Sequence, residues 1–323
     1  MASDDHLTLK GIATKWRADS LGNQIEESLT RWLKWAFLEI YGYVNVTRTS
    51  PSTTFVQDAT PLYQLVRAKD ENYTDGRTYQ SFASDWVWET GLAQGGTPQV
   101  AQIYVNGSLK TTGDATYGHR IDYPRGRVVF DSVINNSDDV EANFAFRTPS
   151  FVSAELPWFQ ELMFDMFRVD EAEFLASFTS GRYSQLAETR RQLPVVGIEL
   201  VDRKASQPYE LGNGVSKWRF QDVLFHIFAD NKSDVKAISD KLEAQDDKAI
   251  YLVDTDALRE DSGFPHDLNY QGELVTSPST YPTIITDFRA EKGVFANTSI
   301  QKLPPINNWL HRAIVRTTFT AIT

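Results

Sequence analysis

The chain has no cysteine in 323 residues and no long apolar run. Without cysteine it can form neither a disulfide nor a thiolate metal site, which is typical of a protein made in a reducing cytoplasm. No segment approaches the roughly 20 consecutive apolar residues of a membrane-spanning helix. Residues Met1–Asp19 also lack the apolar core of a signal peptide. We therefore expect neither secretion nor insertion into a membrane.

Recognisable catalytic patterns are also missing. There is no Gly-x-Ser-x-Gly elbow, no phosphate-binding glycine loop and no dinucleotide fingerprint. The five histidines fall in separate segments, and no two have the spacing that would hold a metal on one face. The sequence therefore predicts no catalytic residue, no cofactor and no metal. The histidines stand at positions 6, 119, 226, 266 and 311.

Two groups of carboxylates are candidates for a metal or catalytic site. Asp254 and Asp256 follow a predicted strand, where a divalent cation could bind, and Asp138–Asp139 precede Glu141. Carboxylates in turns are far more often simply solvated. His226 lies within a predicted strand, where a core histidine with a satisfied hydrogen bond is the favoured interpretation.

Positive charge is in short supply, because the net charge is −11. Binding along duplex DNA requires clustered lysine and arginine, so this balance argues against a DNA-wrapping protein. It fits a surface that DNA slides past. It equally fits a protein whose acidity only keeps it in solution, which is the more common reason for such a charge.

Residues 194–245 contain the most regular pattern in the chain. Apolar residues alternate in Val195–Val201, and a second apolar strand is predicted over Lys217–Ala229. Glycine and asparagine between them, in Pro208–Gly214, predict a hairpin turn. After Asp222 the second strand becomes continuously apolar, so either both its faces are buried or a bulge shifts the register there.

A capped helix and a further strand complete this unit. Val235, Ile238 and Leu242 recur at helical spacing, and residues 230–233 supply helix-capping side chains. The strand Ala249–Val253 follows. The pattern predicts an antiparallel sheet with a helix across one face.

The order of these elements resembles the tail-terminator proteins of tailed bacteriophages. The resemblance rests on a hairpin with a Tyr-Glu-Leu-Gly tip, a strand ending in Phe-Ala-Asp, and a helix opening with Asn-Lys-Ser-Asp. It implies a ring of identical subunits, hexameric in that family, that closes the tail tube and receives the head. The implied partners are other copies of the chain, the tail tube protein and a head-side neck protein (stopper or adaptor), with DNA crossing the lumen unbound.

The same resemblance implies a place in the virion neck, after assembly in the cytoplasm of the bacterial host. We expect no enzymatic activity, because the sequence shows no catalytic constellation. Subunits would meet through the sheet edge and the hairpin. The interface candidates are Tyr209, Glu210, Leu211, Asn213 and Trp218.

The N-terminal third adds a helix and a β-rich segment. After an arm at residues 1–22, a broad apolar stripe predicts a helix over Gln24–Tyr41 that includes Ile40. Short strands and turns then predict a β-sandwich or small barrel over Val44–Phe151. The predicted strands there are 44–47, 84–89, 102–105, 117–123, 128–130 and 140–146, with Asn106–Gly107 as a hairpin turn.

We therefore predict an α+β fold, in which helices brace an antiparallel sheet and a β-sandwich or small barrel is inserted. The segments are an arm and helix at 1–43, the β-rich domain at 44–151, and the terminator-like domain at 152–323. An end-to-end pair of domains fits nearly as well. Residues 254–282 form a long connection, and the remaining strands are predicted at 283–288 and 309–322, the last pairing with Lys217–Ala229.

The aromatic residues leave an alternative function open. Trp86, Trp88 and Tyr104 could stack on sugars, as in a tail fibre or baseplate component with a carbohydrate-binding β-sandwich. Aromatic residues in strands more often belong to the core.

Overall fold

The structure is a computed structural model of the chain. It describes residues 21–49, 61–70, 72–89, 91–163, 192–208, 217–255, 281, 283–287, 289–306 and 310–322.

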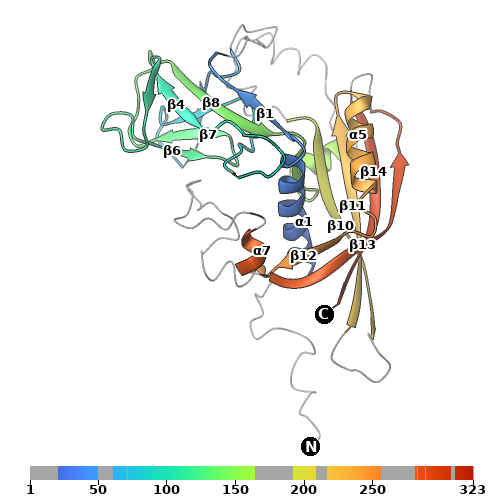
Figure 1. Cartoon of the computed structure of the whole chain (residues 1–323). Helices are drawn as coiled ribbons and strands as arrows, with labels where there is room; N and C mark the ends of the chain where they lie inside the picture. The colour runs from blue at the N-terminus through green and yellow to red at the C-terminus, as the bar shows by residue number, and fades with distance from the viewer. Residues whose placement is uncertain are drawn as a thin grey trace, which may run out of the picture.

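A curled six-stranded sheet forms the larger part of this mixed α+β fold (Figure 1). Its strand order is β12-β13-β14-β11-β10-β9. Neighbouring strands are antiparallel, except that β9 runs parallel to β10. The strands are β9 (Ser150–Ser153), β10 (Val195–Pro208), β11 (Lys217–Ala229), β12 (Ala249–Val253), β13 (Arg289–Lys302) and β14 (His311–Ile322).

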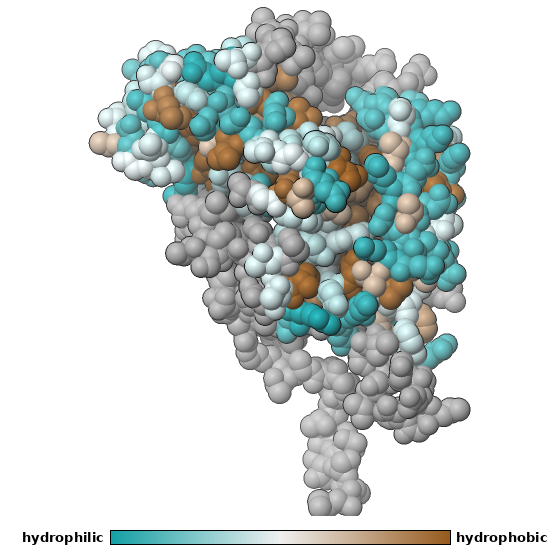
Figure 2. Space-filling view, in the orientation of Figure 1, coloured by the Kyte–Doolittle hydropathy of each residue, from teal (hydrophilic) through white to brown (hydrophobic). Residues whose placement is uncertain are grey.

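Two helices cover one face of this sheet, which we call the inner face. They are α1 (Leu21–Leu38) and α5 (Lys232–Glu243), and both share one core with the strands (Figure 1). Alternate residues of β11, such as Val223 and Phe225, point into that core and are fully buried. The other side of α5 is hydrophilic (Figure 2).

Residues 217–253 fold as predicted. The side chain of Asn231 accepts a hydrogen bond from the backbone N–H of Asp234 and caps α5. Val235, Ile238 and Leu242 are buried beneath the helix. The last strand, β14, pairs along the whole of β11, which confirms the expected central position.

The irregularity expected near Asp222 lies in the neighbouring strand. β11 keeps a regular register with β14 from Trp218 to Ala229, whereas β10 shifts its register between Leu200 and Lys204. The apolar residues of β11 that face away from the helices are half-buried or buried. The continuous apolar run therefore reflects burial on both faces.

Two predictions around the sheet are wrong. Residues Thr283–Asp287 form a short helix, α7, and the strand lies later, in β13. A bulge between Ala296 and Ser299 interrupts the alternation of β13, which hides the strand in the sequence. Helix α1 ends at Leu38, so Ile40 lies beyond the apolar stripe and is 46% exposed.

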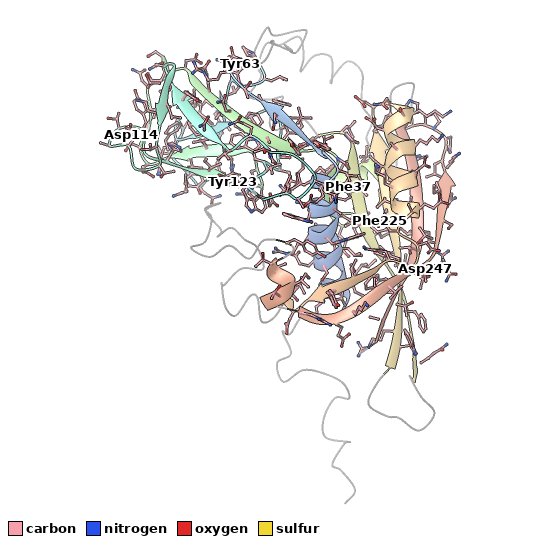
Figure 3. The ribbon with its side chains drawn as sticks, viewed as in Figure 1. Phe37, Tyr63, Asp114, Tyr123, Phe225 and Asp247 are labelled. Atoms are coloured by element: carbon pink, nitrogen blue, oxygen red, sulfur yellow. The ribbon has the colours of Figure 1, made fainter. Side chains whose placement is uncertain are left out.

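The segment between α1 and β9 forms two antiparallel sheets of four strands each, in the orders β1-β8-β4-β5 and β2-β3-β7-β6. Figure 3 marks this β-rich region with Tyr63, Asp114 and Tyr123. A single apolar core joins residues from both sheets, as in a sandwich. The strands are β1 (Tyr43–Val46), β2 (Val66–Arg67), β3 (Thr78–Gln80), β4 (Gln102–Val105), β5 (Ser108–Lys110), β6 (His119–Asp122), β7 (Arg127–Phe130) and β8 (Val140–Arg147).

The predicted strand 84–89 is reduced to a single bridge between Trp86 and Phe146. Asp85 has a φ of 58°, a left-handed conformation that no regular strand contains. Residues 84–89 therefore form a connecting segment and not a strand of either sheet. None of the helices in the described part of the chain is long and apolar enough to cross a membrane.

Candidate functional site

Only one of the predicted interface residues lies in the described part of the structure. Tyr209, Glu210, Leu211 and Asn213 lie outside the described residues. Trp218 is half-buried at the start of β11, opposite Gln207 of β10 and Ile322 of β14. It therefore lies in the sheet between two paired strands.

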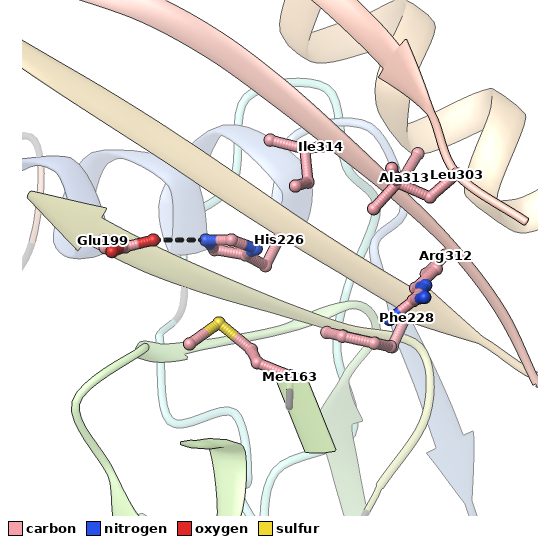
Figure 4. Close-up of a pocket in the computed structure, with 8 residues that line it drawn as sticks. All are labelled: Met163, Glu199, His226, Phe228, Leu303, Arg312, Ala313 and Ile314. Carbon is pink, nitrogen blue, oxygen red and sulfur yellow. Dashed lines mark hydrogen bonds and ion pairs between the residues drawn. The ribbon is translucent and has the colours of Figure 1, made fainter. Parts of the chain in front are cut away.

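A pocket opens on the outer face of the sheet, on the side away from α1 and α5 (Figure 4). Its volume is about 180 Å³, below the roughly 300 to 1,000 Å³ of sites for small-molecule ligands. It is large enough for one big side chain. The pocket is lined by Met163, Glu199, His226, Phe228, Leu303, Arg312, Ala313 and Ile314.

The short helix α2 (Pro157–Met163) closes one side of this outer-face pocket. Its Phe159 packs against β10 at Gly197, where a Cβ atom would overlap the phenyl ring. Glycine at this position therefore lets α2 approach the sheet, and Met163 at the end of α2 reaches the pocket. Phe159 also meets the ring of Phe228 edge-on, with centroids 5.5 Å apart.

The polar part of the pocket is a histidine–carboxylate pair. His226 Nε2 lies 2.5 Å from Glu199 Oε2 across the β10–β11 ladder. The side chain of His226 is 12% exposed and that of Glu199 is 37% exposed. The sequence favoured a histidine with a satisfied hydrogen bond at position 226, and the bond to Glu199 confirms this. Its place beside a cavity was not visible in the sequence, because Glu199 is 27 residues away.

The carboxylate groups considered for chemistry do not form a site within the described residues. Glu141 is paired with Arg48, and Asp138 accepts a hydrogen bond from Asn106. Asp254 is half-buried after β12, and Asp256 lies outside the described residues. No group of three or more potential metal ligands occurs among the residues that the structure describes.

The aromatic residues proposed for sugar binding do not form an open platform. Trp86 is 0% exposed and stacks on Phe144 with ring centroids 4.3 Å apart. The ring of Trp88 packs against the guanidinium of Arg147 at 4.5 Å. The ring of Tyr104 lies under the guanidinium of Arg48. The interpretation of Trp86 as a core residue is confirmed.

A buried ionic cluster ties the β-rich region to α1. Arg147 of β8, 1% exposed, donates to Asp85 Oδ1 at 3.1 Å and also pairs with Glu89. Lys34 of α1 also pairs with Asp85, at 3.1 Å from Oδ2. Burial by itself raises the pKa of Asp85, but the positive charges of Lys34 and Arg147 outweigh it and hold the pKa below its usual value. Nothing in the spacing of these residues indicates the cluster.

The end of α1 makes a second attachment to the same region. The carboxylate of Glu39 accepts backbone hydrogen bonds from Ala93, Gln94 and Gly95 at 2.7 to 3.3 Å. Burial acts to raise the pKa of Glu39, but these three N–H donors lower it by more. Leu38 packs beside them in a small apolar cluster with Val87. We call these two attachments together the joint.

No family model matches the chain, and a search of curated proteins finds no similar sequence.

Proposed function

We propose that the chain is a virion structural protein of a tailed bacteriophage, a ring-forming tail terminator of the neck. In this proposal each copy docks on its neighbours to close a ring at the end of the tail tube. The ring then receives a head-side neck protein, and DNA crosses its lumen without specific binding.

The observation that carries the proposal is the layout of the large sheet. Two helices bury its inner face, β11 pairs along its length with β10 and β14, and the outer face carries a small pocket. A ring requires two different surfaces on each subunit, so that one surface of a copy meets the other surface of the next. The outer face with its pocket, and the opposite side of the subunit, are two different surfaces of this kind.

The chemistry of the described residues supports a binding role more than catalysis. The outer-face pocket holds a histidine and a carboxylate but no serine, threonine or lysine in the position of a nucleophile. The carbohydrate-binding alternative loses its main feature, because Trp86 is buried in the sandwich core.

Purified protein tests this proposal most directly. Mass photometry and electron microscopy of negatively stained particles should reveal closed rings of one size, and the rings should sediment with tail tubes. A chain that stays monomeric at high concentration and ignores tail tubes would rule the proposal out. Binding to a glycan array that a Trp88→Ala variant loses would support the alternative function.

A further inference from the structure

Most of the exposed apolar side chains gather beside the joint. Seven large apolar side chains are exposed in the described part of the chain, and four of them surround the end of α1 and strand β1. Contiguous surfaces of this kind commonly mark interaction sites. We call these four residues the joint patch; they are Ile40, Tyr41, Val44 and Val100, with exposures of 46%, 67%, 41% and 55%.

Backbone contacts hold the joint patch together. The side chain of Asn45 in β1 accepts a hydrogen bond from the backbone N–H of Gln99 at 2.9 Å, so the segment that carries Val100 lies beside β1. Ile40 and Tyr41 follow directly from α1. The four residues therefore lie on segments that adjoin one another, at the end of α1 and beside β1.

Tyr41 is the most exposed member, and its backbone is fixed by the turn that follows α1. Its φ of 62° is left-handed, and the turn is closed by a hydrogen bond of 2.7 Å from the N–H of Gly42 to the carbonyl of Phe37. The phenol ring lies against Gly96, where an added Cβ atom would approach ring atom Cε1 to 3.1 Å. An aromatic side chain has only two rotatable side-chain angles, so it loses little conformational entropy when it binds.

The outer-face pocket matches such a side chain in size and chemistry. Its volume of about 180 Å³ suits one large side chain, and Phe228 and Ile314 provide apolar walls. The exposed carboxylate of Glu199 can accept a hydrogen bond from a phenol hydroxyl. Tyrosine, with an apolar ring and a polar end, fits this combination.

The joint patch and the pocket lie on opposite sides of the sheet. Helix α1, which leads to Tyr41, packs on the inner face, whereas Glu199 and His226 point to the outer face, and Figure 4 shows α1 behind the strands. Tyr41 therefore cannot fill the pocket of its own chain. A contact between two different surfaces on two copies is head-to-tail and can close a ring.

We propose that the outer-face pocket receives the side chain of Tyr41 from a neighbouring copy of the chain. Ile40 and Val100 of that copy then lie at the rim of the pocket. This inference rests on the proposed ring assembly and specifies which surfaces meet.

Cysteine cross-linking tests the contact, because the chain has no cysteine of its own. In a Tyr41→Cys/Leu303→Cys double variant, each copy carries one thiol in the patch and one at the pocket. Mild oxidation should give a ladder of covalent multimers that ends at the ring size, since the Cα atoms of a disulfide lie within about 7 Å. Each single variant should stay monomeric on a non-reducing gel.

A Tyr41→Asn variant supplies a second measurement. Asparagine tolerates the left-handed backbone, so the fold should persist, as the melting temperature would verify. The dissociation constant of the assembly should rise at least about tenfold, as expected when an aromatic anchor is lost. The matched control is Leu109→Asn, which alters a residue 54% exposed on β5, away from the patch, and should leave assembly unchanged.

The outcomes separate the two proposals. Rings that form normally in Tyr41→Asn, or a double variant that does not cross-link within intact rings, would overturn this contact and leave the proposed function standing. A wild-type chain that is monomeric at all concentrations would overturn both.

Discussion

The β-rich region and the large sheet fill their interiors with different chemistry. The inner face of the sheet buries aliphatic and aromatic side chains, and its few buried polar residues, such as Ser239 and Gln221, are uncharged. The β-rich region buries charged residues in addition to its apolar core. Its buried charged residues are Asp85, Glu89, Asp122, Arg127, Glu141 and Arg147.

The difference follows from the elements available. Helices α1 and α5 present continuous apolar stripes that cover long strands. The β-rich region has strands of eight residues or fewer, and long loops pack against its sheets. Ion pairs between charged side chains hold these loops in place. Arg127, for example, is paired with both Asp122 and Asp70. Buried charges are tolerated when such partners are present.

The sharpest test of this difference is Arg147→Met. The substitution leaves the carboxylates of Asp85 and Glu89 buried with fewer positive partners, so the free energy of unfolding should fall by about 3 to 5 kcal/mol. Urea denaturation measures this loss. Restoring neutrality in the triple variant with Asp85→Asn and Glu89→Gln should recover much of it, and a failure to recover would mean that packing of Arg147 matters more than its charge.

The stability of the large sheet should depend on buried apolar volume and not on charge. Ile238→Ala removes a side chain that is 5% exposed between α5 and the sheet, and it should cost about 2 to 4 kcal/mol. Urea denaturation at neutral pH and again at pH 4 gives the comparison. The loss should be the same at both values, because no charged group is involved.

Acid should weaken the joint before it weakens the sheet. The pKa of Asp85 is lower in the folded chain than its usual 3.8, and each unit of such a shift corresponds to about 1.4 kcal/mol. This stability is complete above the unfolded pKa and is lost as the pH falls through the folded value. Below about pH 4, the unfolding free energy of wild type should therefore fall more steeply than that of Asp85→Asn. Equal slopes would show that Asp85 is not the titrating group.

The smallest expected effect concerns a single helix cap in the sheet region. Asn231→Ala removes the side-chain oxygen that accepts from Asp234 N–H at 2.8 Å, and it should cost about 1 kcal/mol. Asn231→Gly should lower the unfolding free energy by only about a few tenths of a kcal/mol. Thermal unfolding followed by circular dichroism can resolve the two, and equal losses would contradict a capping role.

Strong periodicity made much of the sheet predictable. β11 and β12 have the bounds that the sequence indicated, and the buried residues of α5 are those at helical spacing. β13 was missed because Asn297, at a φ of 57°, forms part of a bulge that interrupts alternation. The outer-face pocket could not be predicted, since its eight residues come from α2, three strands and the loop after β13.

The sequence by itself determined the local elements, because alternation, helical spacing and capping side chains act over a few residues. It also determined the absence of disulfides. Only the tertiary structure decided that Lys34, Asp85, Glu89 and Arg147 form one cluster, and that His226 meets Glu199 beside a cavity. Such groupings depend on how strands and helices far apart in the chain are brought together, and burial then fixes the partners, since an unpaired charge in the interior is too costly to remain.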